Sequence, residues 1–371
     1  MIQAKRVLLI LFMIGFVGMQ AAPEVIPFDS ERWEMQAAEK RIEAYQGQKS
    51  LYMKGGLALI KDSDFTNGII EFDVAFGKER GFAGVRWRYQ GGGNYEDFYL
   101  RPHQSGNPDA NQYTPVFNGV SGWQLYHGQG YAKPVVYDFN QWMHVKIVVS
   151  GSQAEVYIKD METPAVIIHE LKHDIKSGKL GVGVGNFAPA YFSNFSYTAM
   201  SSPPALKGTP MQMEPPAPGT IMKWQVSNAI NEASLQNKHH LTAAEKSALT
   251  WQPLESEHTG LANLARVQGI SQESNTAFAK VTVFSDFDQI KRVKLGYSDR
   301  VLVYCNDRLI YGGNNTYRTR DYRYLGTIGY FDEVYLDLKK GENELWIAVS
   351  ESFGGWGLQA VFEDQNGIEV R

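Results

Sequence analysis

Cysteine is almost absent from this chain, which has one, Cys305, among 371 residues. A single cysteine excludes an intrachain disulfide and any zinc site built on paired cysteines. Its strand-and-turn context indicates an inert, partly buried thiol. An excess of positive charge is absent too, because 36 Lys and Arg stand against 40 Asp and Glu, for a net charge of -4. No basic field is available to hold a phosphate backbone, so nucleic acid is excluded as a partner.

Motifs of common catalytic sites are missing or out of context. No Gly-x-Ser-x-Gly elbow and no phosphate-binding loop occurs, and Gly91, Gly92 and Gly93 are typical of a turn. His169 and His173 have the spacing of a His-Glu-x-x-His zinc motif, which requires both histidines on one helical face. The surrounding residues favour an extended chain, so we assign neither a catalytic nor a metal-binding residue.

The first residues predict export. Lys5 and Arg6 precede an apolar run over residues 7–17, and small residues up to Ala22 follow it. This is the layout of a secretory signal peptide, here residues 1–22. The run is shorter than the roughly 20 residues that cross a membrane, so no integral membrane segment is expected after cleavage. We expect a secreted or periplasmic protein.

Proline marks the expected organisation of the rest of the chain. Six prolines fall within residues 200–220, a composition typical of an extended linker. We therefore predict one domain over residues 23–199 and a second over 221–371. Short alternating runs predict strands in both. A capping box from Thr242 to Glu245 predicts one short helix within residues 241–249.

The first domain resembles a known superfamily in the order of its motifs. These are residues 54–58, 64–74, 140–149, 155–158, 181–184 and 192–195. Over about residues 45–198 the chain is similar to concanavalin A-like sandwiches, especially their laminin-G and keto-disaccharide hydrolase branches. Residues 297–357, with a Gly-Glu-Asn turn before an apolar strand, resemble galactose-binding-like modules. The resemblances imply an all-β protein of two β-sandwich domains, concanavalin A-like and jelly roll, joined by the Pro-rich linker.

Hydrolysis by the first domain would need a second carboxylate beside Glu71 and Asp73. Laminarinase-like members of the superfamily carry Glu-x-Asp-x-x-Glu, because retaining hydrolysis uses two carboxyl groups about 5 Å apart. Here Phe76 occupies the position of the second Glu. We expect Glu71 and Asp73 to lie on the outer face of the sheet and to pair with Arg86 and Arg88 of the next strand.

Two groups of residues are candidates for binding a sugar. Alternation over residues 94–103 places Phe98 and Leu100 on one face and Tyr95, Asp97, Tyr99, Arg101 and His103 on the other. Aromatic faces cover the apolar patches of a pyranose, and neighbouring polar groups bond its hydroxyls. The candidate ligand-binding residues of the first domain are Tyr99, Arg101, His103, Trp123 and Tyr126. Alternatively, Trp123 and Tyr126 belong to the core and Arg101 pairs with Asp97.

The second domain offers a loop rich in Asn, Arg and Tyr over residues 312–324. Its candidate ligand-binding residues are Asn315, Arg318, Arg320 and, as a stacking platform, Trp356. Alternatively, the arginines lock the loop internally and Trp356 caps the sandwich. No cofactor is assigned, although sandwiches of these types often hold a structural calcium ion, for which Asp62 and Asp64, or Asp286 and Asp288, would supply oxygens.

Together these patterns predict an exported carbohydrate-binding protein with a glycan ligand. Two alternatives remain open: a glycoside hydrolase acting on a poly- or oligosaccharide, and a laminin-G-like adhesion module with a protein partner. A cleft with two convergent carboxylates would favour the hydrolase, and an open polar and aromatic groove would favour the binding protein.

Overall fold

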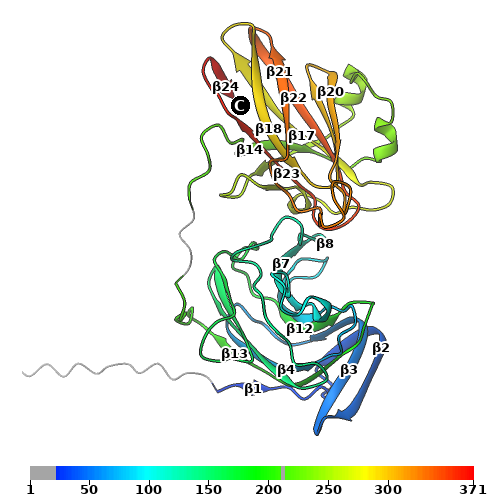
Figure 1. Ribbon diagram of the computed structural model, residues 1–371, viewed down its shortest axis with the longest axis vertical. Coiled ribbons are helices and arrows are strands. Elements are labelled where there is room, and N and C mark those ends of the chain that lie inside the picture. The colour runs from blue at the N-terminus through cyan, green and yellow to red at the C-terminus, as the bar shows by residue number, and fades with distance from the viewer. Residues whose placement is uncertain (1–21, 210–213) are drawn as a thin grey trace, which may run out of the picture.

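The computed structural model describes residues 22–209 and 214–371 and shows an all-β protein (Figure 1). The signal peptide predicted over residues 1–22 lies outside the described residues except for Ala22, as do residues 210–213 of the predicted linker. The strands up to residue 200 form one sheet, and those from residue 223 onward form two. We refer to the two parts as the N-terminal and the C-terminal sandwich.

Thirteen strands form the described part of the N-terminal sandwich. They are β1 (Glu24–Val25), β2 (Trp33–Tyr45), β3 (Gln48–Ile60), β4 (Asn67–Ala75), β5 (Ala83–Tyr89), β6 (Tyr95–Leu100), β7 (Asn111–Phe117), β8 (Val120–Ser121), β9 (Met143–Ser150), β10 (Gln153–Ile158), β11 (Val166–Ile168), β12 (Lys179–Val184) and β13 (Ala190–Met200), with a short 3-10 turn η1 (Pro102–Gln104) after β6.

The long strand β3 connects the two layers of this sandwich. The strand order is β11-β10-β9-β4-β13-β3-β12-β5-β6-β7-β8, with β2 beside β3 and β1 beside β13. The first half of β3 pairs with β13 and the second half pairs with β12. Gly55, with φ of +59°, lies at the crossover, where a side chain would be strained. One strand therefore serves both layers.

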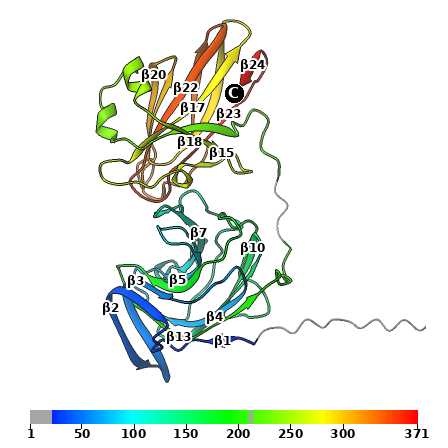
Figure 2. The same cartoon turned by 180° about the vertical axis from the view of Figure 1, so that it is seen from behind.

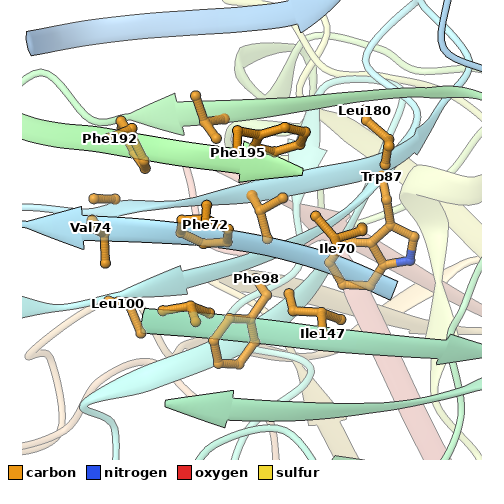
Figure 3. Close-up of a cluster of buried hydrophobic side chains, with 14 of the residues drawn as sticks. Ile70, Phe72, Val74, Trp87, Phe98, Leu100, Ile147, Leu180, Phe192 and Phe195 are labelled. Carbon is orange, nitrogen blue, oxygen red and sulfur yellow. The ribbon is translucent and has the colours of Figure 1, made fainter. Parts of the chain in front are cut away.

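The core lies between these layers and follows the alternation of the sequence. Ile70, Phe72 and Val74 of β4 point inward, and they meet Trp87 and Phe98 from the other layer (Figure 3). All five side chains are buried. The alternate residues on each strand face outward, and this outer face carries polar side chains such as Glu71, Asp73 and Asp97.

The C-terminal sandwich is built from two sheets. One has the order β15-β14-β17-β22-β19-β20 with β24 beside β17, and the other has the order β16-β23-β18-β21. Its elements are β14 (Lys223–Ser227), η2 (Glu232–Leu235), α1 (Ala243–Ser247), β15 (Trp251–Glu255), β16 (Ala262–Asn263), η3 (Leu264–Arg266), β17 (Thr276–Ser285), β18 (Gln289–Tyr297), β19 (Arg300–Cys305), β20 (Arg308–Asn314), β21 (Asp332–Leu338), β22 (Gly341–Ser350), β23 (Gly357–Phe362) and β24 (Ile368–Val370).

Two local predictions are confirmed in this sandwich. The helix α1 begins with the predicted capping box, in which Thr242 and Glu245 each accept a hydrogen bond from the other's backbone N–H. Cys305, at the end of β19, is buried, and burial raises the pKa of its thiol to about 11. The thiol is therefore protonated and unreactive at neutral pH.

The two sandwiches meet through a packed junction at the β7–β8 end of the N-terminal sandwich (Figures 1 and 2). Phe117 and Val120 belong to the hydrophobic core of the C-terminal sandwich. A buried ion pair joins Lys172 Nζ to Glu257 Oε2 at 2.7 Å across the junction. Asn118 donates a hydrogen bond of 2.9 Å to the carbonyl of Ala265. Apolar packing and buried charge thus fix the sandwiches to each other.

Among the described residues, no helix has both the length and the apolar character needed to span a bilayer.

Candidate functional site

Two rows of residues cross six neighbouring strands on the outer face of the N-terminal sandwich. Strand pairing aligns them through β2, β3, β12, β5, β6 and β7. The first row is Glu34, Leu59, Gly181, Arg86, Asp97 and Thr114, and the second is Gln36, Leu57, Gly183, Gly84, Tyr99 and Gln112. We call this surface the glycine-floored face.

Three glycines lie at the centre of the two rows, and neighbouring side chains cover two of them. A Cβ on Gly183 would lie 3.0 Å from the guanidinium carbon of Arg86, so that side chain lies flat over the glycine. A Cβ on Gly181 would lie 2.7 Å from Leu59 Cδ2, whereas the atoms nearest to one on Gly84 belong to the backbone of Phe98 and Tyr99. The missing side chains let Arg86 and Leu59 lie close to the backbone of the sheet.

Polar groups beside this floor are incompletely paired. Arg86 Nε lies 3.8 Å from Asp97 Oδ1, and the guanidinium lies 4.7 Å from the ring centre of Tyr95. Arg86 Nε is buried without a hydrogen-bond partner among the described residues, and Thr114 is fully buried. Burial raises the pKa of Asp97 to about 6, opposed by the charge of Arg86. Unpaired buried polar atoms are costly unless a ligand or solvent satisfies them.

Aromatic rings line one side of the same face. The rings of Phe82 and Tyr99 lie 5.8 Å apart, and those of Phe82 and His103 lie 5.4 Å apart. His103 Nδ1 accepts a hydrogen bond from the backbone N–H of Gly81 at 3.4 Å. The outward direction predicted for Tyr95, Asp97 and Tyr99 matches their burial pattern, which alternates with that of their buried neighbours.

Arg101 links this face to the junction. It donates to Tyr99 Oη at 3.0 Å and also to Gln112 Oε1, while its guanidinium lies 6.0 Å from the Trp123 ring. Trp123 in turn lies 5.8 Å from Phe353 of the C-terminal sandwich. The alternative pairing of Arg101 with Asp97 is not seen, since Asp97 contacts Arg86 instead. The aromatic line thus crosses from one sandwich to the other.

Four sequence-predicted binding residues are buried: Arg101 is 6% exposed, and the other three are exposed by 1% or less, which corrects the prediction for those three. Trp356 has no exposed surface and donates its indole N–H to the Val349 carbonyl at 2.9 Å. Tyr126 is 1% exposed and donates its hydroxyl to Glu257 across the junction. Asn315 is also 1% exposed. Side chains without accessible surface offer nothing to a ligand, so their role is in packing.

The remaining two predicted residues lie apart from the glycine-floored face. Arg320 contacts Asn315 and Asp332, so it holds its loop internally, as the alternative interpretation expected. Arg318 is exposed, and its guanidinium lies 5.0 Å from the Tyr317 ring. Tyr317 lies 6.3 Å from Phe353 and therefore continues the aromatic line. The structure thus brings together Tyr99, Arg101, His103 and Trp123, with Arg318 beyond the far end of the line.

The pairing predicted for Glu71 and Asp73 is wrong, because β5 is not a neighbour of β4. Both carboxylates do lie on the outer face, where they contact His144 on β9, Glu71 at 3.4 Å and Asp73 at 2.7 Å. Arg88 instead donates to the carbonyls of Thr66 and Gly151.

No second carboxylate stands near Asp97 within the two rows. The other acid in them is Glu34, four strands away, or about 19 Å at the usual spacing between strands. Glycoside hydrolysis uses carboxyl groups separated by about 5 to 9.5 Å. The two rows therefore lack the carboxylate spacing that glycoside hydrolysis uses.

Two possible metal sites in the sequence are the pair His169 and His173 and the predicted calcium ligands. Val166–Ile168 is a strand, and residues 169–173 contain no helix, so His169 and His173 lack the helical spacing of a zinc motif. Among the described residues no group of three or more His, Cys, Asp or Glu side chains is placed to hold a metal. Asp62 forms an ion pair with Arg32, and the calcium expectation stays a prediction.

Sequence reasoning missed a groove of about 820 Å³ in the C-terminal sandwich. It runs between η2 and the edge strand β20, and Arg300 spans it with two hydrogen bonds to Glu232, at 2.6 and 2.8 Å. The predicted loop touches this groove only at Gly312, Gly313 and Asn314. Arg86 was missed as a site residue as well, because its role depends on strand order rather than on local pattern.

Comparison with known proteins gives likeness in fold alone. No protein-family model matches the chain, and no curated protein does. Among solved structures, it is similar to the carbohydrate-binding module CBM66 from Bacillus subtilis, with 15% identity, a TM-score of 0.34 and coverage of 45% of this chain and 96% of the module. A β-glucanase from Bacillus licheniformis has 11% identity and a TM-score of 0.34, with 48% and 99% covered.

A third similar structure is a Bacillus subtilis protein of unknown function with a galectin-like fold, at 11% identity, a TM-score of 0.34 and coverage of 48% and 96%. Likeness at this level transfers neither a ligand nor an activity to this chain. The predicted likeness of residues 221–371 to galactose-binding-like modules stays a prediction.

Proposed function

We propose that this chain is a carbohydrate-binding protein whose glycan lies on the glycine-floored face. One observation carries the proposal: the Arg86 guanidinium lies on the outer face near the rings of Tyr95 and Tyr99, and its Nε has no hydrogen-bond partner among the described residues. A sugar hydroxyl would satisfy this nitrogen, and the rings would cover the apolar face of a pyranose. Export, expected from residues 1–22, is part of the same proposal.

The test compares binding by the full chain with binding by two variants. A glycan array identifies a ligand, and calorimetry then measures its affinity for Arg86→Gln and Tyr95→Leu. We expect each substitution to weaken binding at least fivefold. The matched control is Lys146→Gln, which removes a cation from the outer face of the other layer.

The same experiment separates the alternatives. Glycan binding that is unchanged in both variants would refute this face as the site. Release of sugar during long incubation would instead support a hydrolase, and Asp97→Asn should then abolish release. Failure to bind any glycan would leave the chain without a carbohydrate ligand and would favour the protein-binding alternative.

A further inference from the structure

A second concavity, of about 390 Å³, lies between the two sandwiches. Its walls include Arg88, Phe117, His173 and Lys176 from the N-terminal sandwich and Arg266 from the C-terminal sandwich. The site is complete only when the sandwiches are docked. We call it the junction groove. Its volume lies within the roughly 300 to 1,000 Å³ typical of small-molecule sites.

Positive charge dominates the junction groove. Three cations line it, Arg88, Lys176 and Arg266, against one carboxylate, Asp174. Asp174 pairs with Lys176 at 3.1 Å, but both side chains are largely exposed, so the pair is weak. Arg266 lies 3.6 Å from the buried Glu257 and is one-third exposed. The lining thus carries a net positive charge, part of which is buried at Arg88.

Arg88 is the unusual member of this set. Its side chain is 1% exposed and contacts no carboxylate within ion-pair distance among the described residues. Nε and Nη2 donate to the carbonyl of Thr66 at 3.0 and 2.8 Å, and Nη2 also donates to that of Gly151 at 2.6 Å. Its Nη1 has no hydrogen-bond partner among the described residues. A buried guanidinium held only by neutral carbonyls leaves its charge uncompensated by direct contact.

The backbone at Arg88 is held in a strained conformation. Its φ is +50°, in the left-handed region that residues with a side chain rarely adopt. The pairing of β5 with β12 shifts here, so that Trp87 and Arg88 together oppose Leu180 in a bulge. Both residues are consequently buried. Strain of this kind is often retained where it places a functional group.

Glu96 is the buried carboxyl whose charge acts on Arg88. It accepts hydrogen bonds from Tyr113 Oη at 2.6 Å and from the backbone N–H of His173 at 3.2 Å. Burial nevertheless raises its pKa to about 7, so at neutral pH it is partly protonated and offsets Arg88 incompletely. The His173 ring stacks on Phe117 at 4.0 Å, and burial lowers its pKa to about 4, so it adds no charge.

We propose that the junction groove binds an anionic group, a carboxylate or a sulfate, carried by a sugar ring. Arg88 supplies positive potential from within the wall, and Lys176 and Arg266 contact the anion from the two sandwiches. The choice of a sugar as carrier rests on the proposed function, whereas anion binding at the groove does not. The site is distinct from the glycine-floored face, whose lining residues it does not share.

The experiment uses the full chain and calorimetry with four probes: trigalacturonate, a sulfated trisaccharide, free sulfate and a neutral glycan bound by the wild type. Lys176→Gln is the main variant, because its side chain is exposed and should not affect folding. Arg266→Gln is the second. Lys61→Gln, an exposed lysine outside the groove, is the matched control.

We expect one of the two acidic trisaccharides to bind at least tenfold tighter than free sulfate, and Lys176→Gln and Arg266→Gln each to weaken it five- to tenfold. The neutral glycan should bind these variants as it binds the wild type, while Arg86→Gln should show the reverse pattern. Acidic sugar binding that both groove variants leave unchanged, or no binding of either acidic sugar, would overturn the proposal. Free sulfate binding as tightly as the trisaccharides would overturn the sugar as carrier. If Lys176→Gln and Arg266→Gln weakened binding of the neutral glycan but not of the acidic sugars, both the junction groove as the anion site and the glycine-floored face as the neutral site would be refuted.

Discussion

The two outer faces of the N-terminal sandwich both carry aspartates, but these aspartates differ in their hydrogen-bond and ion-pair partners. On the β4–β9 face, Asp73 is hydrogen-bonded by His144 and by Asn194, each at 2.7 Å. On the glycine-floored face, the nearest cation to Asp97 is Arg86, at 3.8 Å. One face completes its polar contacts internally, and the other leaves them open. The two faces therefore differ in how completely their charged groups are paired rather than in the presence of charge.

The protonation of the two aspartates follows the same contrast. Burial tends to raise the pKa of Asp73, but hydrogen bonds from His144 and Asn194 lower it overall. For Asp97, burial raises the pKa to about 6, because only the charge of Arg86 opposes it. At neutral pH both are ionised, but only Asp97 is ionised at a cost to folding.

The largest effect should come from removing an aromatic ring. We expect Tyr99→Ala to weaken glycan binding at least 30-fold, about 2 kcal/mol, as truncation of a central aromatic contact commonly does. Calorimetry with the ligand found on the array measures it. Tyr45→Ala removes a tyrosine ring that stacks on Tyr191 elsewhere on the sandwich, and it should leave affinity unchanged. Equal loss in both variants would mean that the effect is structural.

The same substitution on the two faces should change stability in opposite directions. Since the folded-state pKa of Asp97 is raised, its penalty is absent below about pH 4 and complete above about pH 6. Asp97→Asn should therefore add about 1 to 2 kcal/mol to the free energy of unfolding at pH 7 and nothing at pH 3.5. Asp73→Asn should lower it at pH 7, because its folded-state pKa is lowered.

Urea unfolding at the two pH values decides this prediction. Destabilisation by Asp97→Asn at pH 7 would show that Asp97 is well solvated or paired in solution, and the contrast between the faces would fail.

A smaller effect tests the paired face alone. The hydrogen bond to Asp73, with a second to Glu71, raises the pKa of His144 to about 9. Stabilisation from the charged imidazole is complete below about pH 6.5 and is lost as the pH rises through 9. His144→Gln should cost on the order of 1 kcal/mol at pH 6, after allowance for solvent screening, and nothing at pH 10. Denaturant titrations at both values measure this, and a cost independent of pH would contradict it.

Local patterns predicted local features of this molecule correctly. Alternation placed Phe98 inward and Tyr99 outward, and the sequence from Thr242 to Glu245 predicted α1. These features depend on residues a few positions apart. The predictions that failed depend on contacts between distant residues. Tyr126 is buried because the C-terminal sandwich covers it, and Trp356 lies in the core of its own sandwich.

Strand order explains the remaining misses. Pairing of Arg86 with Asp73 was expected because β4 and β5 are consecutive, yet β13, β3 and β12 separate them in the sheet. The left-handed backbone of Arg88 could not be predicted from Arg88 or from the residues beside it, because it results from the pairing of β5 with β12. Composition and alternation identify faces, and topology decides which residues share one.

The lone, buried Cys305 makes the chain a natural reporter of its own opening. Because the thiol is protonated and enclosed in the C-terminal sandwich, an alkylating reagent reaches it only when that sandwich opens. No other cysteine exists to confuse the signal. The rate of thiol modification, followed by mass spectrometry with and without glycan, would therefore measure how often the C-terminal sandwich opens, without any engineered label.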